Sequence, residues 1–261
     1  MTGTGNFGYL ISGLPPLPLS NRINRLLVNV MNYLNYHALV VLSGGQDSTT
    51  CLYWALREFG KGAVTALTFD YQQRHRIELE CAKRIANLAR VPHIILPINT
   101  FAALGGNALT DHLAVAMDPN PSTGLPNTFV PGRNLIFLTF AAAYAYPRHI
   151  RHLVTGVAQT DYSGYPDCRT TTLQALEQTL RLGMNYEITI HTPLMNLSKC
   201  DTIRLAQDLG ALSAMAWTHT CYEGHRPPCG KCPACHIRAR GFAEAGIPDP
   251  LLELNAPPLS D

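Results

Sequence analysis

The sequence has no apolar run long enough to cross a bilayer. Its longest nearly apolar stretch, LIFLTFAAAYAY from Leu135 to Tyr146, has about 12 residues, whereas a membrane-spanning helix needs roughly 20. It also lacks an N-terminal basic segment leading into an apolar stretch and a small-residue cleavage site, so a secretory signal is not expected. From these absences we expect a cytoplasmic protein with no membrane partner.

Charge is sparse as well. Charged residues are 15% of the chain, below the usual quarter, and the formal net charge is only +2. So small a surplus gives no broad attraction to a polynucleotide, and we expect no direct nucleic-acid partner. The hydrophobic fraction of 46% excludes a chain that is disordered as a whole.

Acidic residues are missing from the N-terminal segment, where none precedes Asp47. Such segments are typical of organelle transit peptides, but Arg22 and Arg25 are the only arginines there and Ser is not enriched. An appended helix is the alternative, because apolar residues between positions 23 and 34 fall on one helical face. We assign residues 1–37 to an N-terminal extension of unknown role.

From Ala38 onward, strand-like and helix-like segments alternate. The predicted strands are 38–42, 63–70, 93–98, 152–157 and 187–191, and the predicted helices are 47–59, 75–90, 134–146, 170–182 and 198–209. Repeated βα units predict a doubly wound, mostly parallel, Rossmann-like α/β sheet with ligands at the carboxyl ends of its strands. We assign this domain to 38–210 and a C-terminal metal-binding helical subdomain with its tail to 211–261.

A glycine-rich turn, SGGQDSTT from Ser43 to Thr50, follows the first strand. Gly44 and Gly45 allow a close backbone approach, neighbouring hydroxyl groups can donate hydrogen bonds, and a helix starts there, as suits a pyrophosphate. The turn lacks the lysine of a Walker A loop and the third glycine of a dinucleotide-binding loop. The alternative is a plain strand-to-helix turn capped by Asp47.

Half of the eight cysteines crowd into one segment, CYEGHRPPCGKCPAC. Seven, two and two residues separate Cys221, Cys229, Cys232 and Cys235. Two overlapping C-x-x-C turns with a fourth thiol predict a closed four-thiolate metal site that is structural rather than catalytic. Zinc and an iron–sulfur cluster both suit thiolate ligands, and nearby histidines at 219, 225 and 236 are alternative ligands that four thiols make unnecessary.

The SGGQDS turn resembles the loop of the PP-loop ATP pyrophosphatases, which have an adenine nucleotide alpha hydrolase-like fold. Four segments, SGGQDSTTCL, FDYQQRHRIE, NTFVPGRNLIFLTFAA and TGVAQTDYSGYPDCR, together with the cysteine segment, resemble the 7-cyano-7-deazaguanine synthase family over about 38–246. Gln72 stands where a glycine is common in that family, and the first 37 residues have no counterpart.

This resemblance implies that ATP activates 7-carboxy-7-deazaguanine by adenylation and that ammonia converts it, through an amide, to 7-cyano-7-deazaguanine, a queuosine precursor. It also implies Mg²⁺ at the phosphates, Zn²⁺ at the four cysteines and a homodimer. Two alternatives stay open: transfer of the activated deazaguanine acyl group to another amine, and tRNA thiolation.

The resemblance further implies three sets of site residues. Those expected to be catalytic are Ser43, Asp47, Ser48 and Arg133. Those expected to contact ATP are Leu42, Ser43, Gly44, Gly45, Gln46, Asp47, Ser48, Thr49, Thr50, Cys51, Leu52, Asp70, His75 and Arg76. Those expected to contact the deazaguanine are Arg133, Asn134, Asp161, Tyr162, Tyr165, Asp167 and Arg169. Cys168 invites interpretation as a nucleophile, although amidation by free ammonia needs no covalent thiol.

Overall fold

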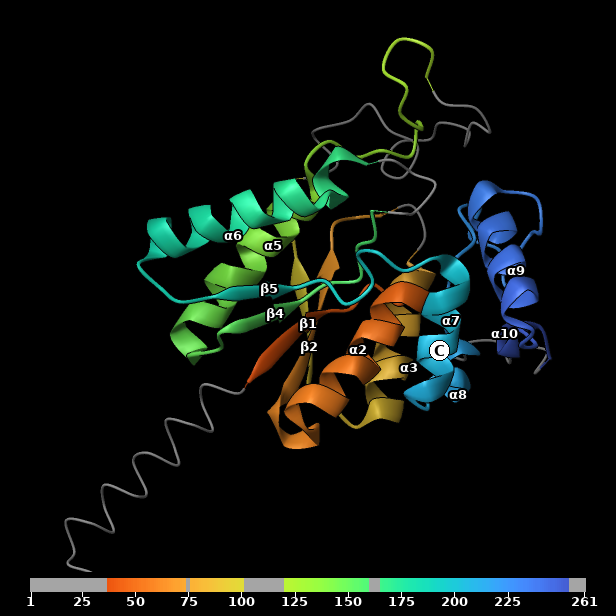
Figure 1. The fold of residues 1–261 in the computed structure, drawn as a ribbon, viewed down its shortest axis with the longest axis horizontal. Coiled ribbons are helices and arrows are strands. Elements are labelled where there is room, and N and C mark those ends of the chain that lie inside the picture. Colours follow the sequence, from red (N-terminus) through yellow and green to blue (C-terminus); the bar gives the residue numbers. More distant parts are fainter. Residues whose placement is uncertain (1–36, 74–75, 101–119, 160–164, 254–261) are drawn as a thin grey trace, which may run out of the picture.

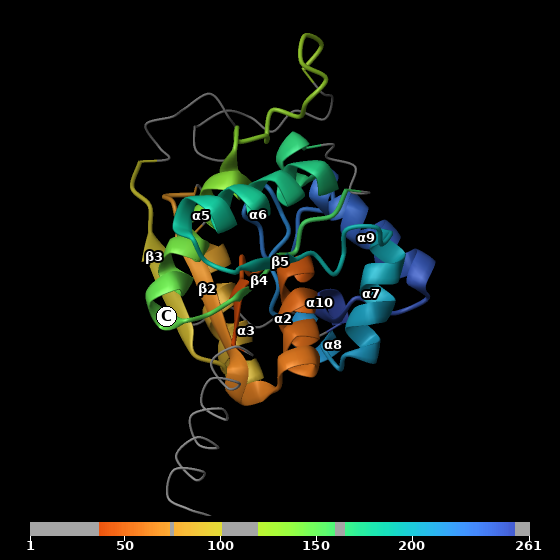
Figure 2. The ribbon, with the colours of Figure 1, turned by 60° about the vertical axis from the view of Figure 1, so that its left-hand side comes forward.

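The protein contains one five-stranded parallel sheet with the strand order β3-β2-β1-β4-β5 (Figures 1 and 2). The computed structural model describes residues 37–73, 76–100, 120–159 and 165–253. The strands are β1 (Ala38–Val41), β2 (Val64–Asp70), β3 (His93–Pro97), β4 (His152–Val154) and β5 (Thr189–His191). The doubly wound α/β fold predicted from the sequence is therefore confirmed.

Helices cover both faces of the sheet, so the strands are buried on two sides. One face carries α2 (Gln46–Phe59) and α3 (Ile77–Ala89), and the other carries α5 (Arg133–Ala145) and α6 (Thr170–Met184), as Figure 2 shows. Along β1, Leu39 packs into the α5–α6 core while Ala38 and Val40 pack into the α2–α3 core. This two-sided burial explains why β1 is apolar throughout.

The chain reverses its direction of winding between β1 and β4, which are neighbours in the sheet. The helix that follows β1 packs on one face, and the helix that follows β4 packs on the other. In open α/β sheets such a reversal separates the loops at the carboxyl ends of the two strands and leaves a crevice between them. The segments after Val41 and Val154 meet at this point.

The C-terminal part of the chain is helical, as predicted, and packs outside the sheet. It follows α7 (Lys199–Asp208) and comprises α8 (Leu212–Met215), α9 (Pro233–Ala245) and α10 (Pro250–Glu253), with α9 packed against α7 (Figure 1). Gly241 permits this contact, since a Cβ there would lie 2.7 Å from Lys199 Cγ. Short 3-10 turns occupy Lys61–Ala63 (η1), Tyr146–Arg148 (η2) and Pro166–Cys168 (η3).

The five predicted strands and five predicted helices are all present and differ from the observed elements only at their ends, by one to three residues, whereas no bounds were predicted for α8, α9, α10 or the 3-10 turns. Outside the described residues lie the N-terminal extension up to residue 36, residues 101–119, His75, Asp161 and Tyr162. In the described ranges, every helix is too short or too polar to cross a membrane.

Candidate active site

Two glycines and two serines set the shape of the phosphate loop, which we define as residues 43–50. Gly44 has a φ of +85°, and a Cβ there would lie 2.4 Å from the Glu78 carbonyl oxygen, so both conformation and space require glycine. The Ser48 hydroxyl is 3.0 Å from the Ser43 hydroxyl and accepts a hydrogen bond from the Ser43 N–H. Because α2 begins at Gln46, its positive dipole end faces the loop.

The last residues of the phosphate loop, and Cys51 after them, are buried. Thr49 and Thr50 donate their hydroxyl hydrogens to the Gly45 and Gln46 carbonyls, and the Cys51 thiol faces the Thr155 carbonyl at 3.5 Å. These three side chains are fully buried and, like that of Leu52, line neither of the two cavities described below. The hydroxyl hydrogen of Thr49 is thus directed to the backbone at the start of α2.

Two adjoining cavities open beside the phosphate loop. The strand-end cavity, of about 230 Å³, lies over β1 and β2, and the loop cavity, of about 280 Å³, lies over the phosphate loop and the C-terminal segment. The residues that line only the strand-end cavity include Leu42, Thr68, Phe69, Tyr71, Gln73 and Phe137. Those that line only the loop cavity include Gly45, Gln46, Asp47, Tyr165, Cys168, Lys199, His219, Thr220 and Arg238.

A shared wall separates the two cavities. Ser43, Glu78, Arg133, Asn134, Gly156, Val157 and Tyr222 line both. Burial raises the pKa of Glu78 to about 7, although the Arg133 guanidinium acts in the opposite direction. The structure thus brings together the predicted residues Ser43, Arg133 and Asn134 with Glu78 and Tyr222, two residues that the sequence analysis did not select.

Lys199 is a third site residue that could not be selected from the sequence. Its Nζ lies 3.0 and 2.9 Å from the two carboxylate oxygens of Asp47, and both side chains line the loop cavity. Lys199 is in place because Ser198 caps α7, accepting the Asp201 N–H at 3.1 Å. The predicted start of a helix at Ser198, near the carboxyl end of a strand, was the one signal in the sequence.

The segment after β2 contributes different residues from those expected. Asp70 accepts a hydrogen bond from Arg76 at 3.1 Å, the Arg76 side chain is 79% exposed, and neither residue lines a cavity. Tyr71 and Gln73 line the strand-end cavity instead, where the Gln73 side-chain oxygen accepts the Tyr71 N–H. Burial raises the pKa of Tyr71 to about 12, so this phenol stays protonated.

The predicted deazaguanine contacts divide into two groups. Tyr165 lines the loop cavity, and its hydroxyl is 2.7 Å from that of Thr128. Asp167 is buried and accepts hydrogen bonds from the Asn134 N–H and side-chain amide, while Arg169 is exposed; neither lines a cavity. Asp167 therefore holds the start of α5 in place, contrary to the expectation that its carboxylate faces a base edge.

Cys168 lines the loop cavity beside Tyr165. Its Sγ accepts a hydrogen bond from the Asn134 side-chain amide at 3.3 Å and lies 3.8 Å from an Asp167 carboxylate oxygen. Gln46 is 6% exposed and lines the same cavity, and in the described part of the chain its Oε1 has no hydrogen-bond partner. Since buried polar atoms are almost always hydrogen-bonded, this oxygen marks a place for a ligand donor.

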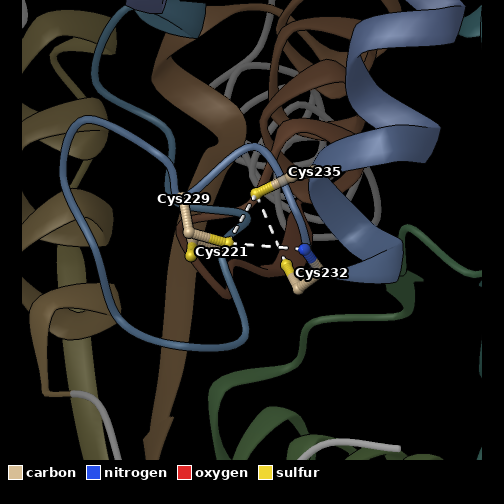
Figure 3. A group of neighbouring side chains, drawn as sticks. All are labelled: Cys221, Cys229, Cys232 and Cys235. Atoms are coloured by element: carbon tan, nitrogen blue, oxygen red, sulfur yellow. Dashed lines mark hydrogen bonds between the residues drawn. The ribbon is translucent and has the colours of Figure 1, made fainter. Parts of the chain in front are cut away.

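The four clustered cysteines converge on one point, as Figure 3 shows. We call residues 221–235 the cysteine knuckle. All four Sγ atoms lie within 4.8 Å of one another, and those of Cys229 and Cys235 are 3.8 Å apart. A tetrahedral site with metal–sulfur bonds of about 2.3 Å has sulfur–sulfur edges of about 3.8 Å, so the arrangement fits a four-thiolate metal ion.

Backbone groups of the knuckle favour the thiolate form of Cys229, whereas burial raises the pKa of Cys232 and of Cys235. The N–H groups of Lys231 and Cys232 point at Cys229 Sγ, both at 3.4 Å, and these hydrogen bonds lower the pKa of Cys229 to about 6. The His219 Nε2 atom lies 2.9 Å from the Cys221 carbonyl oxygen. Its ring is therefore engaged with the backbone of the knuckle, and the group of described side chains that could hold a metal ion here consists of the four cysteines.

The knuckle is also part of the cavity wall. Tyr222, next to Cys221, lines both cavities and forms a side-chain hydrogen bond with Tyr165. The His219 N–H donates to the Gly44 carbonyl at 2.9 Å, which joins the segment before the knuckle to the phosphate loop. Arg238 of α9 lines the loop cavity and forms a buried bidentate ion pair with Asp249.

Comparison with known proteins gives a match over most of the chain. The family model described as "Queuosine biosynthesis protein QueC" matches residues 37–246. A 7-cyano-7-deazaguanine synthase from Chromobacterium violaceum is 69% identical over 83% of this chain and 93% of its own length. One from Laribacter hongkongensis is 66% identical over 83% of this chain and 94% of its own.

Solved structures resemble the chain more distantly. An NH3-dependent NAD synthetase from Campylobacter jejuni, in complex with the nitrate ion, has 15% sequence identity and a TM-score of 0.41. The match covers 73% of this chain and 71% of that one.

Proposed function

The chain belongs to the QueC family of queuosine biosynthesis proteins, and from this membership we propose that it converts 7-carboxy-7-deazaguanine and ammonia, at the expense of ATP, to 7-cyano-7-deazaguanine. The observation that carries the proposal is the 69% identity over nearly the whole length of a relative with that name. The two adjoining cavities support it, because the reaction needs a nucleotide and a second small molecule side by side.

The chemistry is an exchange of carbon–oxygen for carbon–nitrogen bonds. The substrate carboxylate attacks the α-phosphorus of ATP, pyrophosphate leaves, and ammonia displaces AMP to give the amide. The amide oxygen is adenylated in the same way, and loss of AMP and a proton yields the nitrile. Both oxygen atoms of the carboxylate thus leave on AMP, and no oxidant or reductant is required.

We assign the nucleotide to the strand-end cavity and the phosphate loop. Leu42 and Phe69 offer apolar contacts to an adenosine, while Gly44 and Gly45 leave the loop backbone open to the pyrophosphate. Asp47 would hold Mg²⁺, since a carboxylate at the phosphate loop suits this hard cation. Lys199 now pairs with Asp47 and is close enough to neutralise phosphate charge when that carboxylate turns to the cation.

We assign the deazaguanine to the loop cavity, in front of Tyr165 and Cys168. The Tyr165 ring offers a face to a flat heterocycle, and the unpartnered Gln46 oxygen offers an acceptor to a ligand N–H. Arg133, in the shared wall, lies where a guanidinium can neutralise the substrate carboxylate or the α-phosphate. Zn²⁺ held by the four cysteines would fix the Tyr222 side of the cavity without entering the reaction.

The test is a product assay with purified protein, 7-carboxy-7-deazaguanine, ammonium and Mg-ATP, read by mass spectrometry. We expect the nitrile, AMP and pyrophosphate, with the amide as an intermediate. Unchanged carboxylate together with no AMP would refute the proposal, and the amide as final product would limit it to the first half. The homodimer stays a prediction, which light scattering on the same preparation tests.

A further inference from the structure

We propose that Glu78 is the catalytic base that removes protons from the nitrogen atom as the amide and then the nitrile form. The inference rests on the proposed function and adds a residue to it. It starts from position: Glu78 lines both cavities, beside Arg133, in the wall where a nucleotide and a second substrate would meet. No other Asp or Glu of the described residues lines both cavities.

The reaction needs such a group. The nitrogen atom enters as NH3 and ends as a nitrile nitrogen without hydrogen, so three protons leave it. One leaves when the carbon–nitrogen bond forms and the carbon–oxygen bond to AMP breaks. Two leave as the amide becomes the nitrile, one on adenylation of the amide oxygen and one as AMP departs. A base at the boundary between nucleotide and acceptor can take each proton in turn and release it to solvent between steps.

Glu78 is held at this boundary by its backbone. Its carbonyl oxygen lies directly beneath Gly44, so close that a Cβ there would come within 2.4 Å, and Glu78 is the second residue of α3. The helix and the phosphate loop therefore fix the carboxylate relative to the phosphates. The side chain is half-buried and, among the described residues, takes part in no ion pair or hydrogen bond.

The other carboxylates of the region are engaged elsewhere. Asp47 pairs with Lys199, Asp167 accepts two hydrogen bonds from Asn134, and Asp249 pairs with Arg238. His219 is the other group near the loop cavity suited to proton transfer at neutral pH. It does not reach the strand-end cavity, and its Nε2 is engaged with the Cys221 carbonyl.

The surroundings of Glu78 suit a base at neutral pH. Burial raises its pKa to about 7, and Arg133 of α5 opposes this rise. Within the described part of the chain, Tyr71 after β2 and Cys81 on α3 are the other titratable groups that interact with it. A carboxylate with a pKa near 7 is a stronger base than an ordinary one yet is still half ionised at that pH. The basic form therefore appears as the pH rises through about 7.

The test separates adenylation from proton removal in the variant Glu78→Gln. Exchange of labelled pyrophosphate into ATP, dependent on 7-carboxy-7-deazaguanine, reports the first adenylation and should stay within about threefold of wild type. Nitrile formation should fall about 10²- to 10⁴-fold, the usual contribution of a general base. AMP should still form, uncoupled from nitrile, as water consumes the adenylate.

The pH profile, measured at constant free ammonia, gives the second readout. In the wild type we expect the rate of nitrile formation to rise as the pH passes through about 7 and to level off above it, and in Glu78→Gln this dependence should disappear. Glu78→Asp should retain part of the activity and shift the pH dependence of nitrile formation. This second variant tests the proposal if Glu78→Gln does not fold. Glu80→Gln is the matched control, because Glu80 lies on the same helix but is exposed and paired with Lys83.

Parallel loss of pyrophosphate exchange and nitrile formation in Glu78→Gln would overturn the proposal and assign Glu78 to substrate binding. So would a full rate of nitrile formation, or an unchanged pH dependence in Glu78→Asp. Failure of the proposed function has a different signature: wild-type protein would show no exchange dependent on 7-carboxy-7-deazaguanine.

Discussion

The phosphate loop and the cysteine knuckle both line the loop cavity, but different forces fix their shapes. The phosphate loop is shaped by contacts along the chain: two serines five residues apart, a helix start and glycines that fit against α3. The knuckle has little apolar packing of its own beyond its cysteines, Tyr222 and Ala234, and depends on what its thiols bind. The phosphate loop is part of the α/β sheet domain, whereas the knuckle lies outside the sheet and contributes one side of the cavity.

This comparison predicts opposite consequences for damage to each region. A substitution that disrupts the phosphate loop should abolish catalytic activity and leave the protein folded. A substitution that disrupts the knuckle should unfold the C-terminal segment and abolish activity as well. The two meet at the hydrogen bond from the His219 N–H to the Gly44 carbonyl, so neither region is fully independent of the other.

The largest effect is expected from Cys232→Ser. Metal binding contributes on the order of 10 kcal/mol to the folding of small zinc sites, so losing one thiolate should lose the metal and most of the folded C-terminal segment. Metal analysis and thermal unfolding measure both. Cys200→Ser, on α7 and outside the knuckle, should keep the metal. An active variant of Cys232→Ser without zinc would contradict the structural assignment.

Next in size is the effect of Asp47→Ala. Loss of the carboxylate should abolish pyrophosphate exchange, because it removes the proposed magnesium ligand, while zinc content and unfolding temperature stay near wild type. Asp208→Ala, at the exposed far end of α7, should leave exchange unchanged. Loss of zinc in Asp47→Ala would show that the two regions are less separable than the comparison states.

How much of this could be predicted from sequence depends on the range of the interactions. The sheet, the phosphate loop and the cysteine ligands follow from short periodicities and spacings, so they were predicted. Lys199 and Asp47 are 152 residues apart, and only the fold brings them together. Glu78 stood within a selected segment, but a glutamate in the first turn of a helix is favourable in any case, which hid its second role.

Three charged residues expected at the site show the same limit. Arg76, Asp167 and Arg169 have side chains suited to phosphates or a base edge, yet Arg76 pairs with Asp70 at the surface and Asp167 binds Asn134. The sequence shows which side chains can bind a phosphate or a base, but it does not show which protein group each side chain contacts in the fold.

A smaller effect is expected from Gly156→Ala, which probes how the sheet holds the phosphate loop. A Cβ at this position would lie 2.8 Å from the Ser48 nitrogen and 2.9 Å from the Asp47 carbonyl carbon, so the loop must shift. Overpacking of this kind costs about 1–3 kcal/mol. Chemical unfolding should show this loss, with a weakened affinity for ATP. Gly183→Ala, in α6 with open space around it, should instead stabilise the protein slightly.

The smallest effect tests whether the knuckle contributes to the substrate cavity. Tyr222→Phe removes the hydrogen bond with Tyr165, worth about 1 kcal/mol, and should raise the KM for 7-carboxy-7-deazaguanine about fivefold with little change in kcat. Zinc content should not change. Tyr146→Phe, at an exposed position, is the control. An unaltered KM would show that the Tyr222 hydroxyl takes no part in binding the substrate and that the knuckle has only a structural role.

The buried ion pair between Arg238 and Asp249 places the boundary of the folded unit. The family match ends at residue 246, but Asp249 holds a guanidinium that is 2% exposed, and Leu251 beyond it is buried at 1%. A chain shortened to the matched region would leave that guanidinium buried without its counter-ion, a loss of about 3–5 kcal/mol in comparable pairs. The folded unit of this protein therefore extends beyond the family match, through α10, and a boundary set by sequence similarity alone would fall too early in the chain.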